Sequence, residues 1–152
     1  MSINKEAVSR KSSMTCASNY KTFGLAVQAL VALEKHDGKC SSADIASYLH
    51  SESTLIRRIL KTLALAGMIE SREGRDGGYR LKRDVRDITL ADIYSVLEVH
   101  KSISHSMMDG TAEHCFGEQI RDSFASILSE IEDSTLQILE SRTIADIVKE
   151  SI

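Results

Sequence analysis

The chain has 152 residues, 42% hydrophobic and 27% charged, which is the composition of a globular protein with one domain and an appendage. It contains no secretory signal and no apolar run long enough to cross a bilayer, so we expect a cytoplasmic protein without a membrane partner. The three cysteines, Cys16, Cys40 and Cys115, are scattered along the chain. This distribution argues against a disulfide framework and fits a reducing compartment.

The net charge of −3 conceals two parts of opposite sign. Residues 1–90 carry 15 Lys and Arg against 10 Asp and Glu, a balance of +5. Residues 91–152 carry 4 against 12, a balance of −8. The first part is therefore suited to approach nucleic-acid phosphates, whereas the acidic part should face away from them.

The first third of the chain predicts an arm followed by two helices. Residues 1–18 are polar and aperiodic, which indicates a flexible N-terminal arm. Asn19 can cap a helix whose apolar residues recur at helical spacing as far as a turn at residues 36–38. Ser41 to Asp44 then begin a short helix with a capping-box pattern.

A second helix after the turn at residues 50–51 has two contrasting faces. Ser51 can act as its N-cap, and Gly67 supplies its C-terminal stop. One face is apolar and carries Leu55, Ile59, Leu63 and Ala66. The other face presents hydroxyls and cations that suit phosphates and base edges, namely Ser53, Thr54, Arg57, Arg58 and Lys61.

A cationic hairpin is predicted directly after this helix. Residues 68–72 and 79–82 have the pattern of two strands, and residues 73–78 form a tight loop between them. Arg72, Arg75 and Arg80 flank the loop, where Gly77 and Gly78 permit close backbone approach. A helix-turn-helix followed by such a wing is suited to place one helix in the major groove and the hairpin beside it.

The rear of the chain predicts a helix beginning at Thr89, a loop at residues 100–112 and a long helix at 113–141. The long helix carries a heptad-like apolar stripe formed by Ile120, Phe124, Ile127, Ile131 and Ile138, which favours pairing in a twofold dimer over an intramolecular fold. Thr143 begins a short final helix. We therefore expect a mainly α fold with a small β-hairpin wing. Its parts are an arm (1–18), a winged helix-turn-helix domain (19–99), a sensor-region loop (100–112) and a dimerisation segment (113–152).

Residues 71–81, with the sequence SREGRDGGYRL, resemble the wing signature of the Rrf2 family of bacterial regulators. Further resemblance lies at residues 44–46, 55–67, 87–94 and 143–148, so that it covers about residues 19–150 in order. The resemblance implies a winged-helix domain, a long dimerisation helix, and repression or activation controlled by a sensor. We expect a homodimeric transcriptional regulator, and specifically a repressor, that reads a near-palindromic operator in double-stranded DNA.

The cofactor of many relatives is an iron–sulfur cluster held by three cysteines between the post-wing helix and the long helix. In this chain Cys115 alone aligns with them, and a cluster needs about four ligands. His100, His105 and His114 occupy the same segment, so a regulator that senses a metal or cluster through His and Cys ligands is an alternative. No pair has a recognised ligand spacing, and we expect no cofactor.

A thiol is the other candidate sensor. Cys16 lies near Lys11 and Lys21 and beside a predicted helix N-terminus, and both features lower a thiol pKa. Cys40, at the turn before the helix-turn-helix, is the second candidate for redox sensing. Oxidation of either thiol would then change DNA affinity in response to an oxidant, although a small-molecule signal is also open.

The sequence gives little support to an enzyme. It has no P-loop, no nucleophile elbow, no HExxH zinc motif and no dinucleotide fingerprint. An alternative of another class is a winged-helix protein-interaction module that docks on a metabolic enzyme. Salt dependence separates this alternative from a DNA-binding protein, because counterion release makes DNA affinity fall steeply with salt.

Overall fold

The computed structural model describes residues 5–37, 39–75, 77–111 and 115–151, with side chains from residue 19 onward. These residues form seven helices and one antiparallel hairpin. The elements are α1 (Lys5–Lys35), α2 (Ser42–Tyr48), α3 (Ser53–Leu65), β1 (Ile69–Arg72), β2 (Gly78–Leu81), α4 (Leu90–Val96), α5 (His100–Asp109), α6 (Cys115–Glu140) and α7 (Ile144–Glu150). The expected mainly α fold with a hairpin wing is confirmed.

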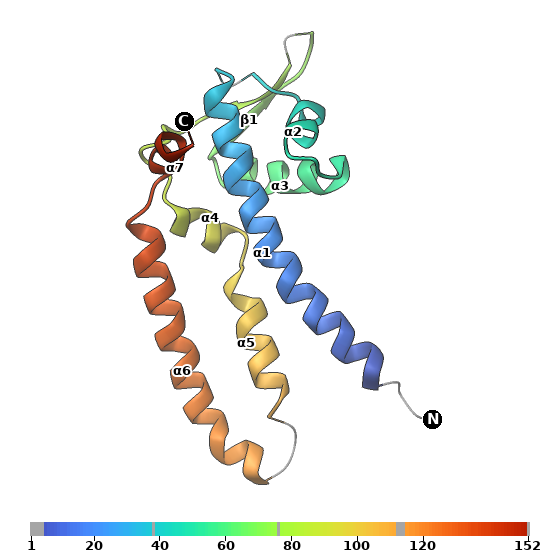
Figure 1. The fold of residues 1–152 in the computed structure, drawn as a ribbon, viewed down its shortest axis with the longest axis vertical. Coiled ribbons are helices and arrows are strands. Elements are labelled where there is room, and N and C mark those ends of the chain that lie inside the picture. Colours follow the sequence, from blue (N-terminus) through green and yellow to red (C-terminus); the bar gives the residue numbers. More distant parts are fainter. Residues whose placement is uncertain (1–4, 38, 76, 112–114, 152) are drawn as a thin grey trace.

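Figure 1 shows two parts, which we name the head and the arm. The head contains the C-terminal half of α1, helices α2, α3, α4 and α7, and the hairpin. The arm consists of α5 and α6, which lie against each other and extend away from the head (Figure 1). Within the described residues, no helix is long and apolar enough to cross a membrane.

Helix α1 begins much earlier in the chain than the sequence predicted. Residues 5–18 are helical, so the expectation of a flexible N-terminal segment that ends at an Asn19 cap is wrong. Neither glycine nor proline interrupts residues 5–23. Because the second half of α1 is fixed in the core through Ala26, Ala29, Leu30 and Leu33, the helix can propagate backward without an apolar stripe of its own.

Helices α2 and α3 form the helix-turn-helix. The capping box of α2 is confirmed: the Asp44 amide donates to Ser41 Oγ (3.1 Å), and the Ser41 amide donates to Asp44 Oδ2 (3.0 Å). Helix α3 is capped by Glu52 without a side-chain hydrogen bond, which corrects the prediction of a Ser51 cap. Ser51 instead closes the preceding turn, where its amide donates to the Ala46 carbonyl (3.0 Å).

The buried face of α3 includes the predicted Ile59 and Leu63 but not the other two residues of the predicted stripe. Leu55 is half-buried and Ala66 is exposed, whereas the fully buried residues are Ile56, Ile59, Leu60 and Leu63. The helix ends as predicted at Gly67, which has a φ of 75°. The Met68 amide donates to the Leu63 carbonyl (3.1 Å) and the Gly67 amide to the Ala64 carbonyl (3.0 Å), which is a Schellman stop.

The hairpin follows the predicted strands to within a residue at each end. Its register pairs Ile69 with Leu81 and Glu70 with Arg80. A short third segment joins β2 near its loop end, since Cys40 and Tyr79 exchange backbone hydrogen bonds of 3.3 and 2.7 Å. This approach requires Gly78, which has a φ of 143° and where a Cβ atom would lie 2.7 Å from the Cys40 carbonyl oxygen.

The arm begins after α4, whose predicted cap is confirmed by a capping box between Thr89 and Asp92. The predicted loop at residues 100–112 is wrong over most of its length, because residues 100–109 form α5. This segment lacks the strong periodicity of an amphipathic helix, and its packing between α1 and α6 fixes it instead. Buried Ser102, whose hydroxyl accepts a hydrogen bond from the Asn19 side chain, ties α5 to α1.

Helix α7 returns the chain to the head. Thr143 begins the helix, as predicted, and forms a capping box with Asp146, and Ile144 and Ala145 are buried in the core of the head. Two backbone hydrogen bonds of 2.9 Å join the starts of α4 and α7, one from the Leu90 amide to the Arg142 carbonyl and one from the Ile144 amide to the Ile88 carbonyl. The two chain ends of the arm, at α4 and α7, therefore both connect to the head.

Candidate nucleic-acid interface

The solvent-facing side of α3 brings the predicted helix contacts together. The buried side fixes the helix on the core, so the opposite side must face outward. All five predicted residues are exposed on it: Ser53, Thr54, Arg57, Arg58 and Lys61. Arg57 Nε lies 3.5 Å from Ser42 Oγ, so this guanidinium lies beside the start of α2. The face can therefore offer hydroxyls, cations and free amides to a phosphate backbone and to base edges.

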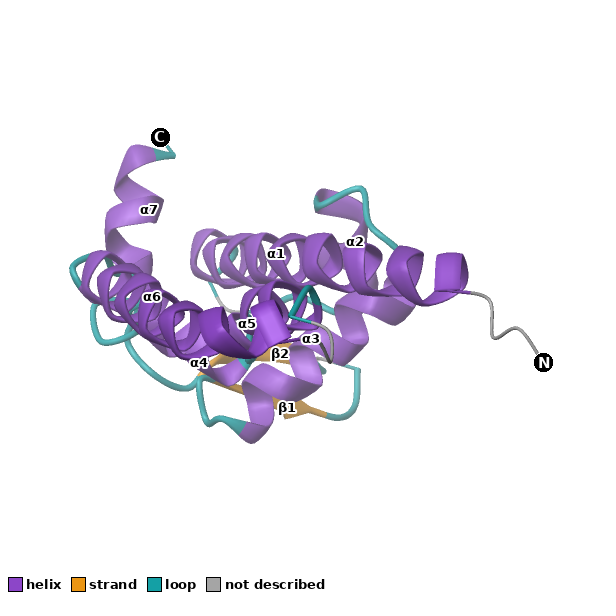
Figure 2. Ribbon diagram, turned by 90° about the horizontal axis from the view of Figure 1, so that it is seen from below, coloured by secondary structure: helices purple, strands orange, loops and turns teal. Residues whose placement is uncertain are grey.

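The hairpin projects from the same head (Figure 1), and its strands lie beside α3 in the view of Figure 2. Arg72 and Arg75 are exposed on it. The loop turns tightly at Gly77, where a Cβ atom would lie 2.6 Å from the Arg72 carbonyl oxygen. A loop of this kind presents cations on a narrow, smooth edge, which is the shape that a minor groove accepts.

Arg80 differs from the other wing arginines. Its guanidinium pairs with the carboxylate of Glu70 directly across the strands, and the two side chains are 41% and 36% exposed. The hydrogen bond from Arg80 lowers the pKa of Glu70, so the carboxylate stays charged and keeps its partner engaged. Arg80 is thus committed to strand pairing in the free protein, a constraint that its spacing in the sequence did not reveal.

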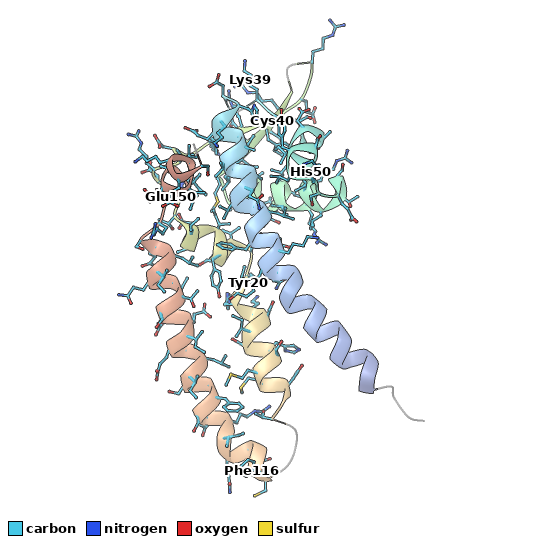
Figure 3. All side chains as sticks on the ribbon, in the orientation of Figure 1. Tyr20, Lys39, Cys40, His50, Phe116 and Glu150 are labelled. Atoms are coloured by element: carbon cyan, nitrogen blue, oxygen red, sulfur yellow. The ribbon has the colours of Figure 1, made fainter. Side chains whose placement is uncertain are left out.

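Lys39 is a cation that the sequence reasoning missed. It is exposed and directly precedes Cys40, which pairs with Tyr79 near the loop end of the hairpin (Figure 3). The amide of Lys39 donates to the His36 carbonyl (3.3 Å), which fixes the turn. No local pattern signals this placement, because it depends on the pairing between Cys40 and Tyr79, which are distant in the sequence.

The cysteines occupy different environments. Cys40 is 2% exposed, and burial together with the nearby charge of Asp44 raises the pKa of its thiol. Both effects disfavour the reactive thiolate at this position. Cys115 is exposed at the start of α6. The side chain of Cys16 lies outside the described residues.

The histidines proposed as alternative metal ligands are engaged separately. His100 Nδ1 lies 3.8 Å from a Glu132 carboxylate oxygen, and His105 Nε2 lies 3.5 Å from one of Asp109. His114 lies outside the described residues. Within the described ranges, no group of three or more His, Cys, Asp or Glu side chains lies close enough together to hold a metal ion. The described donors therefore do not fit a cluster or a metal centre.

Tyr94 occupies the junction between the head and the arm. Its ring meets that of Phe23 edge to face at 5.9 Å, and its side chain is 2% exposed. Burial and the neighbouring Tyr20 raise the pKa of Tyr94 to about 12. The hydroxyl is therefore held in its neutral form between α1, α4 and the start of α5.

Helix α6 carries a second surface, which we name the α6 stripe: Ile127, Ile131 and Ile138. These side chains are 43%, 43% and 66% exposed, respectively. Phe116, at the far tip of the arm in Figure 3, is 69% exposed. Within α6, only Gly117 and Leu128 are buried. A row of large apolar residues at helical spacing therefore lies uncovered in the single chain.

A helix-turn-helix with a hairpin wing and cations on both elements defines the class of winged-helix DNA-binding proteins. The sequence profile of the Rrf2 family, described as an iron-dependent transcriptional regulator, matches residues 20–150. The chain therefore belongs to the Rrf2 family of transcriptional regulators, and the resemblance at residues 71–81 is confirmed. This family consists of DNA-binding regulators rather than enzymes.

Individual relatives agree with this assignment. YwgB of Bacillus subtilis (strain 168), which is named among HTH-type transcriptional regulators, is 27% identical over 131 residues, 81% of this chain and 79% of its own. The structure of T. potens IscR is 28% identical with a TM-score of 0.64, over 86% of this chain and 85% of that one. The oxidised form of Staphylococcus aureus CymR shares the fold, with 20% identity and a TM-score of 0.62 over 84% and 92%.

Proposed function

We propose that the protein is a homodimeric, sequence-specific repressor that reads a near-palindromic operator through α3 and its wing. The observation that carries the proposal is the two-sided character of α3. Its inner face is locked into the core, whereas Arg57, Arg58 and Lys61 are all exposed outward. An arginine in this position can bind guanine through two hydrogen bonds in the major groove.

The homodimer is supported by the α6 stripe. An acidic helix with exposed isoleucines at helical spacing needs an apolar partner, and a second copy of α6 offers the matching surface. Twofold symmetry would place two α3 helices on one face of DNA, with half-sites about one helical turn or a multiple of it apart. A dimer bound in this way covers promoter DNA, which is the basis for proposing repression.

The DNA interface is tested by substitutions in α3 and in the wing. Arg57→Ala or Arg58→Ala should lower the preference for operator over random duplex by about 1–3 kcal/mol. Arg75→Ala should weaken both DNAs evenly and make the salt dependence shallower, because the wing contacts backbone or the degenerate minor groove. Fluorescence anisotropy at several salt concentrations measures both effects.

Arg121→Ala, which removes an exposed cation from α6, is the matched control and should change neither quantity. If duplex DNA were not bound even at low salt, the protein-interaction alternative would replace the proposal. An operator footprint with a single half-site bound by a monomer would refute the dimer.

For the signal, we propose thiol oxidation at Cys16 without a resident cofactor. Cys40 is less suited, because its thiol is buried and its pKa is raised. Peroxide should change the DNA affinity of the parent protein and leave that of Cys16→Ser unchanged. Protein purified without oxygen should be colourless and nearly free of iron. Stoichiometric iron would refute the absence of a cofactor, and an unaltered response of Cys16→Ser would exclude this cysteine as the sensor.

A further inference from the structure

An apolar groove lies on the head between three helices, and its described lining includes no residue of α3 or of the hairpin. Its floor is α1, through Val27, Val31 and Ala32, and its walls are α2 and α7. Tyr48 and Leu49 come from the α2 side and Ile147 from α7. The groove has a volume of about 320 Å³, which falls within the range of about 300–1,000 Å³ that small-molecule sites occupy.

One end of the groove is polar and positive. Lys35 lies there and donates one hydrogen bond to the Ser151 carbonyl (2.8 Å), which leaves two ammonium protons available. Beside it, the ring of His36 stacks on that of Tyr48, with centroids 4.6 Å apart and an angle of 4° between the planes. The stacked pair forms a flat wall: His36 directly follows α1, and Tyr48 is the last residue of α2.

The lining selects a ligand by both charge and shape. The remaining polar members are Gln28 and Ser151, and the ten described residues of the lining include one lysine and no acidic residue. A flat hydrocarbon body would cover the valines and the isoleucine and lie along the stacked rings. A single carboxylate at its end would meet Lys35, so the complementary ligand is a small aromatic monocarboxylate.

We propose that this groove is an effector site for such an aromatic monocarboxylate. A ligand there would contact both α2, the first helix of the helix-turn-helix, and α7, which follows the arm. Occupancy would therefore change the position of α2 relative to α1 and, through it, the DNA affinity of the head. The regulatory half of this inference rests on the proposed DNA-binding function, whereas the binding half does not.

The binding half is tested without DNA. The probes are 2-naphthoate and the neutral 2-naphthalenemethanol, titrated into the full chain and followed by amide chemical shifts. Both should shift amides of α1, α2 and α7, and naphthoate should bind more tightly. Lys35→Gln should weaken naphthoate about threefold to fivefold, as expected for an exposed charge contact, and leave the alcohol unchanged. Lys21→Gln, an exposed lysine of the same helix outside the groove, is the matched control.

Ala32→Trp should fill the groove and abolish the binding of both probes, with thermal unfolding as the check of its fold. Shifts confined to α6, or equal binding by parent and Ala32→Trp, would overturn the site. The regulatory half predicts that saturating naphthoate changes the DNA dissociation constant of the parent but not of Ala32→Trp. Binding of naphthoate without any change in DNA affinity would overturn the effector role. A parent that binds no DNA would instead contradict the function proposed above.

Discussion

The head and the arm of this protein differ in how they cover their apolar residues. The head encloses a continuous core to which α1, α3, the hairpin and α7 all contribute, and the basic part of the sequence forms most of it. In the arm, α6 leaves the α6 stripe open to solvent and carries much of the acidic balance. The head is therefore stabilised by its own chain, whereas the arm leaves apolar side chains that the described residues do not cover.

The largest effect should come from the core of the head. Leu60→Ala removes a side chain that is 0% exposed beneath the outward face of α3, and should lower the free energy of unfolding by about 2–5 kcal/mol. Leu65→Ala makes the same change on the same helix at a position that is 82% exposed, and should alter stability by less than about 0.5 kcal/mol. Chemical denaturation measures both, and equal losses would contradict the buried face assigned to α3.

The arm should respond through assembly rather than through folding. Ile138→Glu places a charge on the α6 stripe, in the proposed dimer contact, and should raise the dimer dissociation constant by about 30-fold or more, since about 2 kcal/mol is lost. Because Ile138 is 66% exposed in the single chain, the monomer should stay folded. Ser129→Glu, on the opposite side of α6, is the control in sedimentation experiments. A parent that sediments as a monomer would refute the dimer itself.

The junction of head and arm should lose stability at high pH. The pKa of Tyr94 is raised to about 12 in the folded protein, above the value of about 10 in unfolded chains, so folding favours the neutral hydroxyl. This contribution is fully present below pH 10 and is lost as the pH rises toward 12, by on the order of 2 kcal/mol. Tyr94→Phe cannot ionise there, and its stability should fall less over this range. Parallel curves for the two proteins would disprove the assignment.

The smallest effect concerns the wing. Glu70→Gln removes the carboxylate that engages Arg80 and should free this guanidinium for a phosphate. DNA affinity should rise about twofold, and the salt dependence should steepen by up to one additional contact. Glu73→Gln, in the same hairpin, removes an equal charge without freeing Arg80. It therefore separates the effect of the released guanidinium from the effect of net charge. An identical rise in both variants would show that net charge alone is responsible.

The elements that the sequence predicted well are those specified locally. The helix starts at Ser41, Thr89 and Thr143 and the stop at Gly67 each depend on residues only a few positions apart, and the structure has all four. Helix α5 and the first half of α1 were missed because weakly periodic segments depend on packing partners. The hydrogen bond between Asn19 and Ser102 joins residues 83 positions apart.

In the candidate site, too, the sequence predicted the features that local pattern specifies and missed those that tertiary contacts specify. The outward face of α3 follows from helical periodicity, and all five of its predicted residues are exposed. The ion pair that engages Arg80, the burial of Cys40 against Tyr79 and the position of Lys39 follow from strand pairing or from tertiary contacts. The groove between α1, α2 and α7 requires the return of the chain after α6, which no local pattern specifies.

The paired hydrogen bonds between the starts of α4 and α7 hold the arm at a fixed angle to the head. An arm joined to the head through one segment of chain would swing, but an arm whose two chain ends both enter the head transmits rotation to it. Two heads joined through such arms would keep a fixed separation and a fixed angle about the DNA axis. Insertion of a single base pair between half-sites rotates one of them by about a tenth of a turn. We expect this rigid frame to resist that rotation, so that operator spacing is measured as strictly as operator sequence.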